Sequence, residues 1–297
     1  MNYLPAKYPQ RWKAFQDHSY KQIEELMTGY GKVDILWLDG GWVRPFSSID
    51  TSVSWQKAIT IEQDIDMPRI AAMARSHQPG LLVVDRTVGG EYENYITPEG
   101  HVPNADLGVP WETCLPMGTS WSWVPNEQYK STDEIIRTLV KVVSRGGSLL
   151  LNVAPGPDGQ LDSAAYVRLK EVGAWLKVNG EAIYGTVPSS WEREQPKIHS
   201  GIGSTWNVRP VDRNYINGTL YFIIDPIDQT PFRFRFLGKH PPKIKVLGFT
   251  EYPTIERDGD ELVVSLPKSI VSRTRTLVTL AFERKQARGF KWFPDPK

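Results

Sequence analysis

Polar side chains follow three apolar runs of the sequence, at the points where strands are expected to end. Asp39 closes the run VDILWL and precedes two glycines. Asp85 and Arg86 close LLVV, and Asn152 closes SLLL. Because side chains at the carboxyl ends of parallel strands line the site of an α/β fold, we expect these residues to form a polar pocket. The alternative is structural, since each could instead cap the helix that follows its strand.

Further carboxylates lie between Arg86 and about Ser131, in a stretch rich in Gly, Pro and Trp. Among them are Glu91, Glu93, Glu99, Asp106 and Glu112. A glycosidase needs two carboxyl groups, one as nucleophile or base and one with a raised pKa as proton donor. A loop acid beside a strand-end acid would supply that pair. The aromatic residues of the stretch argue against disorder, so we expect an irregular functional loop.

Composition excludes several classes of function. The 297 residues carry 35 basic and 34 acidic side chains, which argues against nucleic acid or an anionic membrane as partner. One cysteine excludes a disulfide framework and a cysteine-rich zinc site, and the five histidines lack the spacing of metal ligands. We therefore expect neither a metal nor a cofactor. The 11 tryptophans fit an aromatic core, with sugar stacking as the less favoured interpretation.

Helices and apolar strands, which must position these residues, alternate along the first ~185 residues, as in parallel α/β folds. Sequence patterns predict helices at 11–29, where the apolar residues fall on one side, and at 61–77, 133–144 and about 163–178, with Pro68 either starting or kinking the second. Apolar runs predict strands at 33–38, 81–85 and 148–153, buried on both faces by helices.

The pattern changes after Tyr184 to short strand-like runs separated by turn pairs. Two such pairs are Asn217-Gly218 and Asp258-Gly259. We therefore expect residues 186–297 to form an all-β domain, most simply a sandwich. Asn217 also begins a glycosylation acceptor, Asn-Gly-Thr, although the hairpin turn is the favoured interpretation.

Five blocks of the sequence resemble, in order, motifs of glycoside hydrolase family 29, the α-L-fucosidases. They are WLDG (37–40), DR with YITPE (85–86 and 95–99), WETC with SWSW (111–114 and 120–123), SRGGSLLLNVAPGPDG (144–159) and WLKVNGEAIYGT (175–186). Their joint occurrence in family order is hard to obtain by chance. The resemblance implies an α/β fold with a (β/α)8-type (TIM) barrel at residues 1–185, followed by a β-sandwich domain at 186–297.

The resemblance also implies a retaining glycosidase that releases L-fucose from fucosylated glycans. In that family pattern Asp39 is the nucleophile and Glu99 is the acid/base, with Glu112 as the rival acid/base. The residues implied to contact the sugar are Trp37, Arg86 and Trp121. The alternative is a non-catalytic fucose- or carbohydrate-binding protein derived from a fucosidase, which would use the Trp-rich loop without hydrolysis.

The chain departs from the family pattern before Asp39. The family carries a His-Trp and a His-His-Asp-Gly-Phe motif there, and this sequence has neither. We therefore expect a barrel incomplete at its N-terminus, in a chain that is truncated, decayed or completed by another chain. The expected partners are therefore a fucosylated glycan and either further copies of the chain, in an oligomer, or a complementing chain. The N-terminal residues do not resemble a signal peptide, whereas the family is commonly exported or lysosomal, so the compartment is left open.

Overall fold

The computed structural model describes residues 4–104, 107–188, 205–210, 218–224, 231–235, 241–273 and 277–283. The chain divides into two compact units, the first comprising residues 1–97 and 108–112, and the second comprising residues 98–107 and 113–297. Asp106, Asn217 and His199, which is one of the five histidines, lie outside the described residues, so the structure does not address the predictions that concern them.

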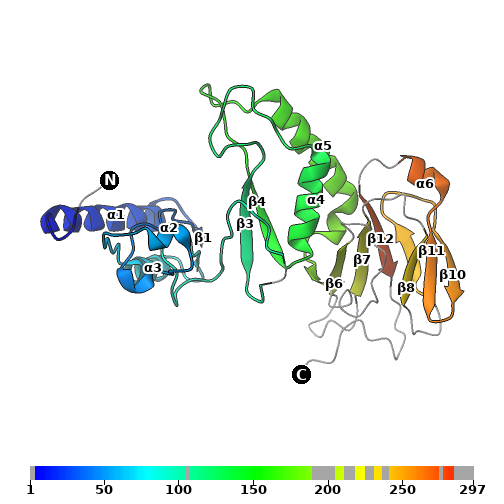
Figure 1. Ribbon diagram of the computed structural model, residues 1–297, viewed down its shortest axis with the longest axis horizontal. Helices are drawn as coiled ribbons and strands as arrows, with labels where there is room; N and C mark the ends of the chain where they lie inside the picture. The colour runs from blue at the N-terminus through cyan, green and yellow to red at the C-terminus, as the bar shows by residue number, and fades with distance from the viewer. Residues whose placement is uncertain are drawn as a thin grey trace. The chain divides into compact units, whose positions relative to one another are not determined.

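Helices make up most of the regular structure of the first unit (Figure 1). Its helices are α1 (Pro9–Gly29), η1 (Phe46–Ser48), α2 (Ser54–Lys57) and α3 (Met67–His77). Strands β1 (Ile35–Leu36) and β2 (Leu82–Val83) pair in parallel, as predicted. Pro68 lies in the first turn of α3, so it starts this helix rather than kinking it, because proline suits a position whose N–H needs no partner.

Only one face of β1 and β2 is covered within this unit. Leu36 and Val83 are 4% and 1% exposed, and they pack in one apolar cluster with residues of α1 and α3. Ile35 and Leu82 point to the other face and are 46% and 41% exposed. The prediction that these strands are buried on both faces is therefore wrong, because no second layer packs on them among the described residues of the unit.

A second two-stranded sheet consists of β3 (Trp111–Pro116) and β4 (Gly147–Asn152). The prediction of an irregular segment from 86 to 131 is wrong at β3. The run WETCLP lacks an alternating apolar pattern, so its strand conformation depends on backbone hydrogen bonds to a neighbouring segment. The N–H of Glu112 donates to the carbonyl of Ile96 at 3.0 Å, and the N–H of Cys114 donates to the carbonyl of Pro98 at 3.1 Å.

Two long helices of the second unit, α4 (Thr132–Val143) and α5 (Ser163–Asn179), agree with the predicted ranges, and η2 (Gly180–Ala182) follows α5. Ser131 caps α4, since its side chain accepts a hydrogen bond from the N–H of Glu134 at 3.2 Å.

Two antiparallel sheets face each other across the apolar core of the β region. The first has the strand order β5 (Val187–Pro188), β6 (Thr205–Pro210), β7 (Gly218–Ile224), β12 (Val278–Glu283) and β9 (Lys243–Val246). The second has the order β10 (Thr254–Asp258), β11 (Glu261–Ser265) and β8 (Phe232–Arg235), and the short helix α6 (Lys268–Arg273) follows β11. Phe222, Val264 and Leu280 are fully buried between the sheets. The predicted turn at Asp258-Gly259 joins β10 to β11.

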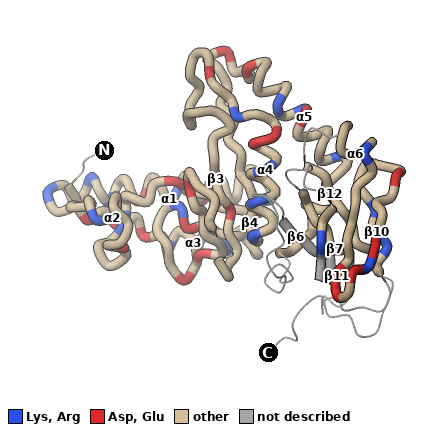
Figure 2. The backbone as a smooth tube through the Cα atoms, turned by 45° about the vertical axis from the view of Figure 1, so that its right-hand side comes forward, with Lys and Arg blue, Asp and Glu red and all other residues tan. Residues whose placement is uncertain are grey.

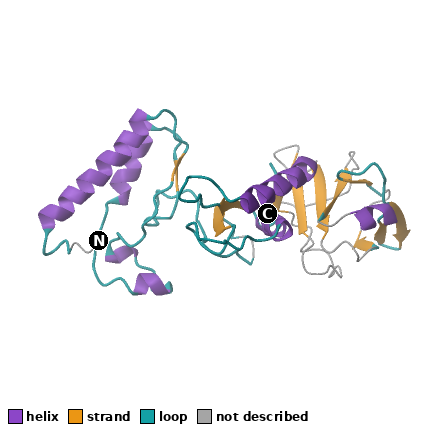
Figure 3. Ribbon diagram, turned by 90° about the horizontal axis from the view of Figure 1, so that it is seen from above, coloured by secondary structure: helices purple, strands orange, loops and turns teal. Residues whose placement is uncertain are grey.

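Helices α4 and α5 cover the outer face of the five-stranded sheet (Figures 1 and 3). Tyr221 and Ile223 of β7 form one apolar cluster with Ile136 of α4 and Trp175 of α5. The Trp175 indole N–H also donates to the carbonyl of Leu277 at 3.3 Å. The central strands β7 and β12 are therefore buried on both faces.

Basic and acidic side chains are interspersed along the described backbone, in agreement with the near-zero net charge (Figure 2). Among the described helices, none combines the length and the apolar character needed to cross a membrane.

Candidate active site

Three of the predicted site residues come together where β1 and β2 end. The Arg86 Nη2 atom donates to Asp39 Oδ1 at 3.0 Å, and Arg86 Cζ lies 5.9 Å from the centre of the Trp37 ring. The side chain of Asp39 is 63% exposed, whereas that of Arg86 is 15% exposed. A largely buried guanidinium therefore orients a carboxylate that remains accessible to a substrate.

Two glycines turn the chain after the strand-end aspartate. Gly40 has a φ of +134°, a backbone conformation that residues other than glycine rarely adopt. A Cβ atom on Gly41 would lie 2.9 Å from both the Arg44 Nη2 atom and the carbonyl oxygen of Thr87. The first glycine thus permits the turn, and the second permits two loops to approach each other closely.

Asp85, the other strand-end acid, has a structural role. Its carboxylate accepts a hydrogen bond from the Thr97 hydroxyl, and its backbone N–H donates to the carbonyl of Tyr95 at 3.3 Å. These bonds fasten the segment around Tyr95 alongside β2.

The two candidate proton donors lie in different surroundings. Glu112 is partly buried on β3, and this burial raises the pKa of its carboxyl group. Burial, followed by the nearby charges of Glu112 and Asp85, raises the pKa of Tyr95 to about 12. Glu99 is exposed and pairs in a parallel bridge with Cys114 in the second unit. Burial thus gives Glu112 the electrostatic environment of a general acid, whereas the motif resemblance favours Glu99.

Trp121, predicted to pack on a sugar, is 43% exposed on the loop that follows β3 in the second unit. Its carbonyl accepts a hydrogen bond from Asn152 Nδ2 at 3.0 Å, so this strand-end amide holds the Trp-rich loop. The carboxylate of Glu127 organises the same loop by accepting from the N–H and hydroxyl of Thr119 at 3.0 and 2.8 Å. These hydrogen bonds, the backbone one first, lower the pKa of Glu127.

Sequence reasoning missed Arg44, which is 4% exposed. Its guanidinium donates to the carbonyls of Gly41 and Thr87, and Nη1 donates to Gln56 Oε1 at 2.8 Å. Burial lowers the pKa of Arg44. No motif distinguishes this arginine, and the second glycine of the turn is the only signal in the sequence that points to a close contact there.

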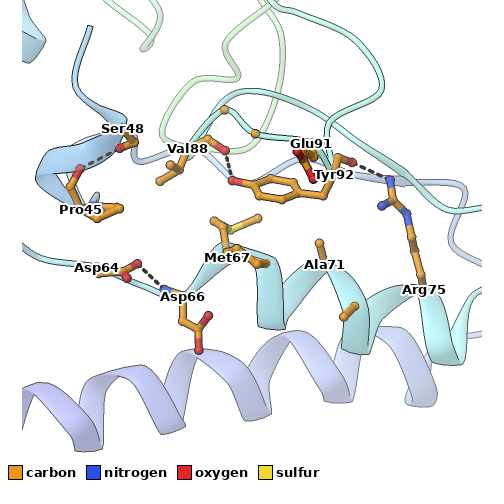
Figure 4. A pocket seen from close by; sticks show the side chains of 14 residues that line it. Pro45, Ser48, Asp64, Asp66, Met67, Ala71, Arg75, Val88, Glu91 and Tyr92 are labelled. Atoms are coloured by element: carbon orange, nitrogen blue, oxygen red, sulfur yellow. Dashed lines mark hydrogen bonds between the residues drawn. The ribbon is translucent and has the colours of Figure 1, made fainter.

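The first unit also contains an open cavity of about 620 Å³ (Figure 4). Its lining includes Met67, Tyr92 and Arg75, but none of the six predicted site residues, all of which the structure describes. The Tyr92 hydroxyl donates to the carbonyl of Val88, and Arg75 Nη2 donates to the carbonyl of Tyr92 at 2.6 Å. Burial raises the pKa of Tyr92 to about 12. These side chains hold the cavity wall together, and the chemistry of the predicted site lies elsewhere.

Metal coordination finds no support in the described part of the chain. There, no three His, Cys, Asp or Glu side chains gather in a group that could hold a metal ion.

The family model described as "Alpha-L-fucosidase" matches residues 1–181. An alpha-L-fucosidase of Dictyostelium discoideum is 29% identical over 269 residues, which cover 88% of this chain and 51% of the relative. The human plasma alpha-L-fucosidase is 34% identical over 117 residues, covering 35% of this chain and 25% of the relative. The chain thus spans about half the length, or less, of these curated relatives.

Solved structures of similar fold are also fucosidases. Alpha-L-fucosidase isoenzyme 1 from Paenibacillus thiaminolyticus has a TM-score of 0.72 at 22% identity, covering 92% of this chain and 63% of that chain, a likeness of fold alone. The Thermotoga maritima alpha-fucosidase has a TM-score of 0.66 at 27% identity, covering 91% of this chain and 56% of that chain. Because the family model matches more than half of its residues, this chain belongs to the alpha-L-fucosidase family.

Proposed function

We propose that this chain provides the nucleophile of a retaining α-L-fucosidase that releases L-fucose from fucosylated glycans. The observation that carries the proposal is the exposed carboxylate of Asp39, held by Arg86 beside Trp37, in a member of the alpha-L-fucosidase family. One structure of the Thermotoga maritima relative is a complex with fucose, and we extend that ligand to this chain. The family match favours hydrolysis over the alternative of a carbohydrate-binding protein.

The proposal includes a (β/α)8-type barrel domain at residues 1–185, to which β1 to β4 contribute, and a β-sandwich domain at 186–297. Support comes from apolar residues on the open faces of three strands, Ile35, Leu82 and Leu150, each more than 40% exposed. In a barrel of this type alternate strand residues point inward, and layers of branched apolar side chains fill the interior.

The proposed reaction proceeds in two displacements. A carboxylate oxygen of Asp39 bonds to the anomeric carbon while the glycosidic C–O bond breaks, and Glu99 donates its proton to the leaving oxygen. Glu99, now a carboxylate, then takes a proton from water as the water oxygen attacks the anomeric carbon and Asp39 departs. Arg86 orients the nucleophile, and Trp37 and Trp121 offer apolar faces to the sugar. Two inversions at one carbon leave the configuration of the product retained.

Hydrolysis of 4-nitrophenyl α-L-fucoside tests the role of Asp39. We expect turnover by the chain, and a loss of about 10³-fold or more in kcat on Asp39→Gly, because the nucleophile is gone. Azide should restore turnover of this variant and yield β-L-fucosyl azide, since it attacks from the side of the missing carboxylate. Asp34→Gly is a matched control, because Asp34 is 71% exposed and pairs with Lys32 before β1. Absence of turnover by the folded chain would contradict the proposal.

A series of aryl fucosides decides between the two acid/base candidates. A variant that lacks the general acid retains activity on substrates with very acidic leaving groups, and loses about 10²–10⁴-fold on those that need protonation. We expect this pattern for Glu99→Gln and an unchanged dependence on the leaving group for Glu112→Gln. The opposite result would assign the proton donor to Glu112.

A further inference from the structure

Arg44 ties together the two loops that carry the nucleophile and its arginine partner. Its Nη2 atom donates to the carbonyl of Thr87 at 3.1 Å, and its Nε atom donates to the carbonyl of Gly41. Gly41 follows Asp39 by two residues, and Thr87 directly follows Arg86. One planar guanidinium therefore holds the backbone next to both members of the Asp39–Arg86 pair.

Thr87 makes a second connection between the same loops. Its hydroxyl donates to the carbonyl of Leu38, the residue that directly precedes Asp39. Thr87 thus contacts one loop through its side chain and accepts from Arg44 through its carbonyl. The backbone on both sides of Asp39 is connected to the residue that follows Arg86.

The partners of Arg44 are neutral. Within the described part of the chain its guanidinium forms no ion pair, and it donates only to oxygens of Gly41, Ser48, Gln56 and Thr87. The Trp55 ring lies on one side, with its centre 5.1 Å from the Arg44 Cζ atom. Burying a cation without a carboxylate partner is unfavourable for stability. The presence of an arginine here is therefore better explained by its guanidinium joining the two loops than by a contribution to stability.

We propose that Arg44 is a positioning residue, which sets the orientation of Arg86 towards Asp39 and so places the nucleophile. The inference rests on the proposed function of Asp39. A lysine at this position keeps the charge, but its single ammonium lacks the planar fork that reaches Gly41, Gln56 and Thr87 together. Arg44→Lys therefore separates the geometry of the fork from its charge.

The kinetic test compares Arg44→Lys with Arg75→Lys on 4-nitrophenyl α-L-fucoside. Arg75 is a matched control, because it is partly buried and donates to the carbonyl of Leu81, which precedes the start of β2, and to that of Tyr92. We expect Arg44→Lys to lower kcat by about 10- to 100-fold with KM within about threefold, because small misplacement of a reacting group is enough for such losses. Arg75→Lys should leave kcat within about twofold at a similar loss of Tm. Equal losses of kcat in both variants would overturn the proposal.

A second measurement does not depend on turnover. In ¹⁵N-Trp-labelled protein the indole N–H signal of Trp37, identified by its loss in Trp37→Phe, reports the arginine that lies over this ring. We expect Arg44→Lys to shift the signal in the direction that Asp39→Asn shifts it, and Arg75→Lys to leave it in place. If the Trp37 signal does not move in Arg44→Lys, the positioning role is overturned. If the signal moves but the wild-type chain shows no turnover, only the proposed function is contradicted. If Arg44→Lys does not fold, Arg44→Gln, which removes the buried charge, replaces it with the same expected results.

Discussion

The strands β7 and β12 are covered on both faces, whereas β1 and β2 are covered on one. Phe222 and Ile223 are neighbours on β7 and are both fully buried, between the two sheets and under the helices respectively. Leu36 on β1 is 4% exposed, but its neighbour Ile35 is 46% exposed. Strands of similar apolar content therefore differ in how many packing partners they have. We therefore expect the strands covered on both faces to contribute more to stability, whereas the half-covered pair presents Asp39 and Arg86 at its ends.

The largest effect should follow from a cavity in the fully covered region. Phe222→Ala is expected to lower the free energy of unfolding by about 3–5 kcal/mol, because this ring is fully buried and packs edge-on against Phe232 at 5.9 Å. Urea unfolding followed by circular dichroism measures the loss. Tyr252→Ala, at a 58% exposed position, is the control and should change little. A loss below about 1 kcal/mol in Phe222→Ala would contradict the packing of this core.

Neighbouring substitutions on β1 test its two faces directly. Leu36→Ala should destabilise the chain by about 2–4 kcal/mol because it leaves a cavity under α1 and α3. Ile35→Ala should lower the stability by less than about 1 kcal/mol, because its side chain is half exposed already. The same unfolding experiment measures both variants. Equal losses would mean that the second face of β1 is packed in solution, and the comparison between the two sheets would fail.

Crowding the turn after the nucleophile should have a smaller effect on stability. Gly41→Ala places a methyl group 2.9 Å from the backbone carbonyl of Thr87, which must move, at a loss of about 1–3 kcal/mol. We expect kcat to fall as well, because the two strand-end loops separate. Gly29→Ala is the control, since an added Cβ there meets no atom within 4 Å. If Gly41→Ala retains both Tm and kcat, the loops adapt more easily than the close contact implies.

The smallest effect concerns pH. Burial raises the pKa of Glu112, so the folded chain binds this proton more tightly than the unfolded chain does. Its contribution to stability is present below the unfolded pKa and is lost as the pH rises through the folded pKa. Glu112→Gln should therefore raise the Tm relative to the wild type more at pH 7 than at pH 4, by on the order of 1 °C. Thermal unfolding at the two pH values measures this difference, and equal shifts at both would contradict it.

Much of the local structure could be predicted from the sequence, because it depends on residues close together in the chain. The helical periods of α1 and α4, the serine cap of α4 and the turn between β10 and β11 are such features. The Asp-Gly-Gly turn at the end of β1 is another, since glycine is the residue that suits a φ of +134° at Gly40. The motif blocks also predicted the family to which the chain belongs.

Only the tertiary structure decided which polar residues meet and which strand faces are covered. Asp39 and Arg86 are paired although 47 positions separate them, and Arg44 reaches Thr87 across 43 positions. The sequence also could not show that Asp85 holds a neighbouring segment while Asp39 remains exposed. The sequence pattern of a strand shows only which of its own side chains are apolar. Which residues it pairs with, and which of its faces is covered, depends on segments that the fold brings in from distant positions. This dependence on distant partners is the physical reason why the motifs could indicate the site and only the fold could assemble it.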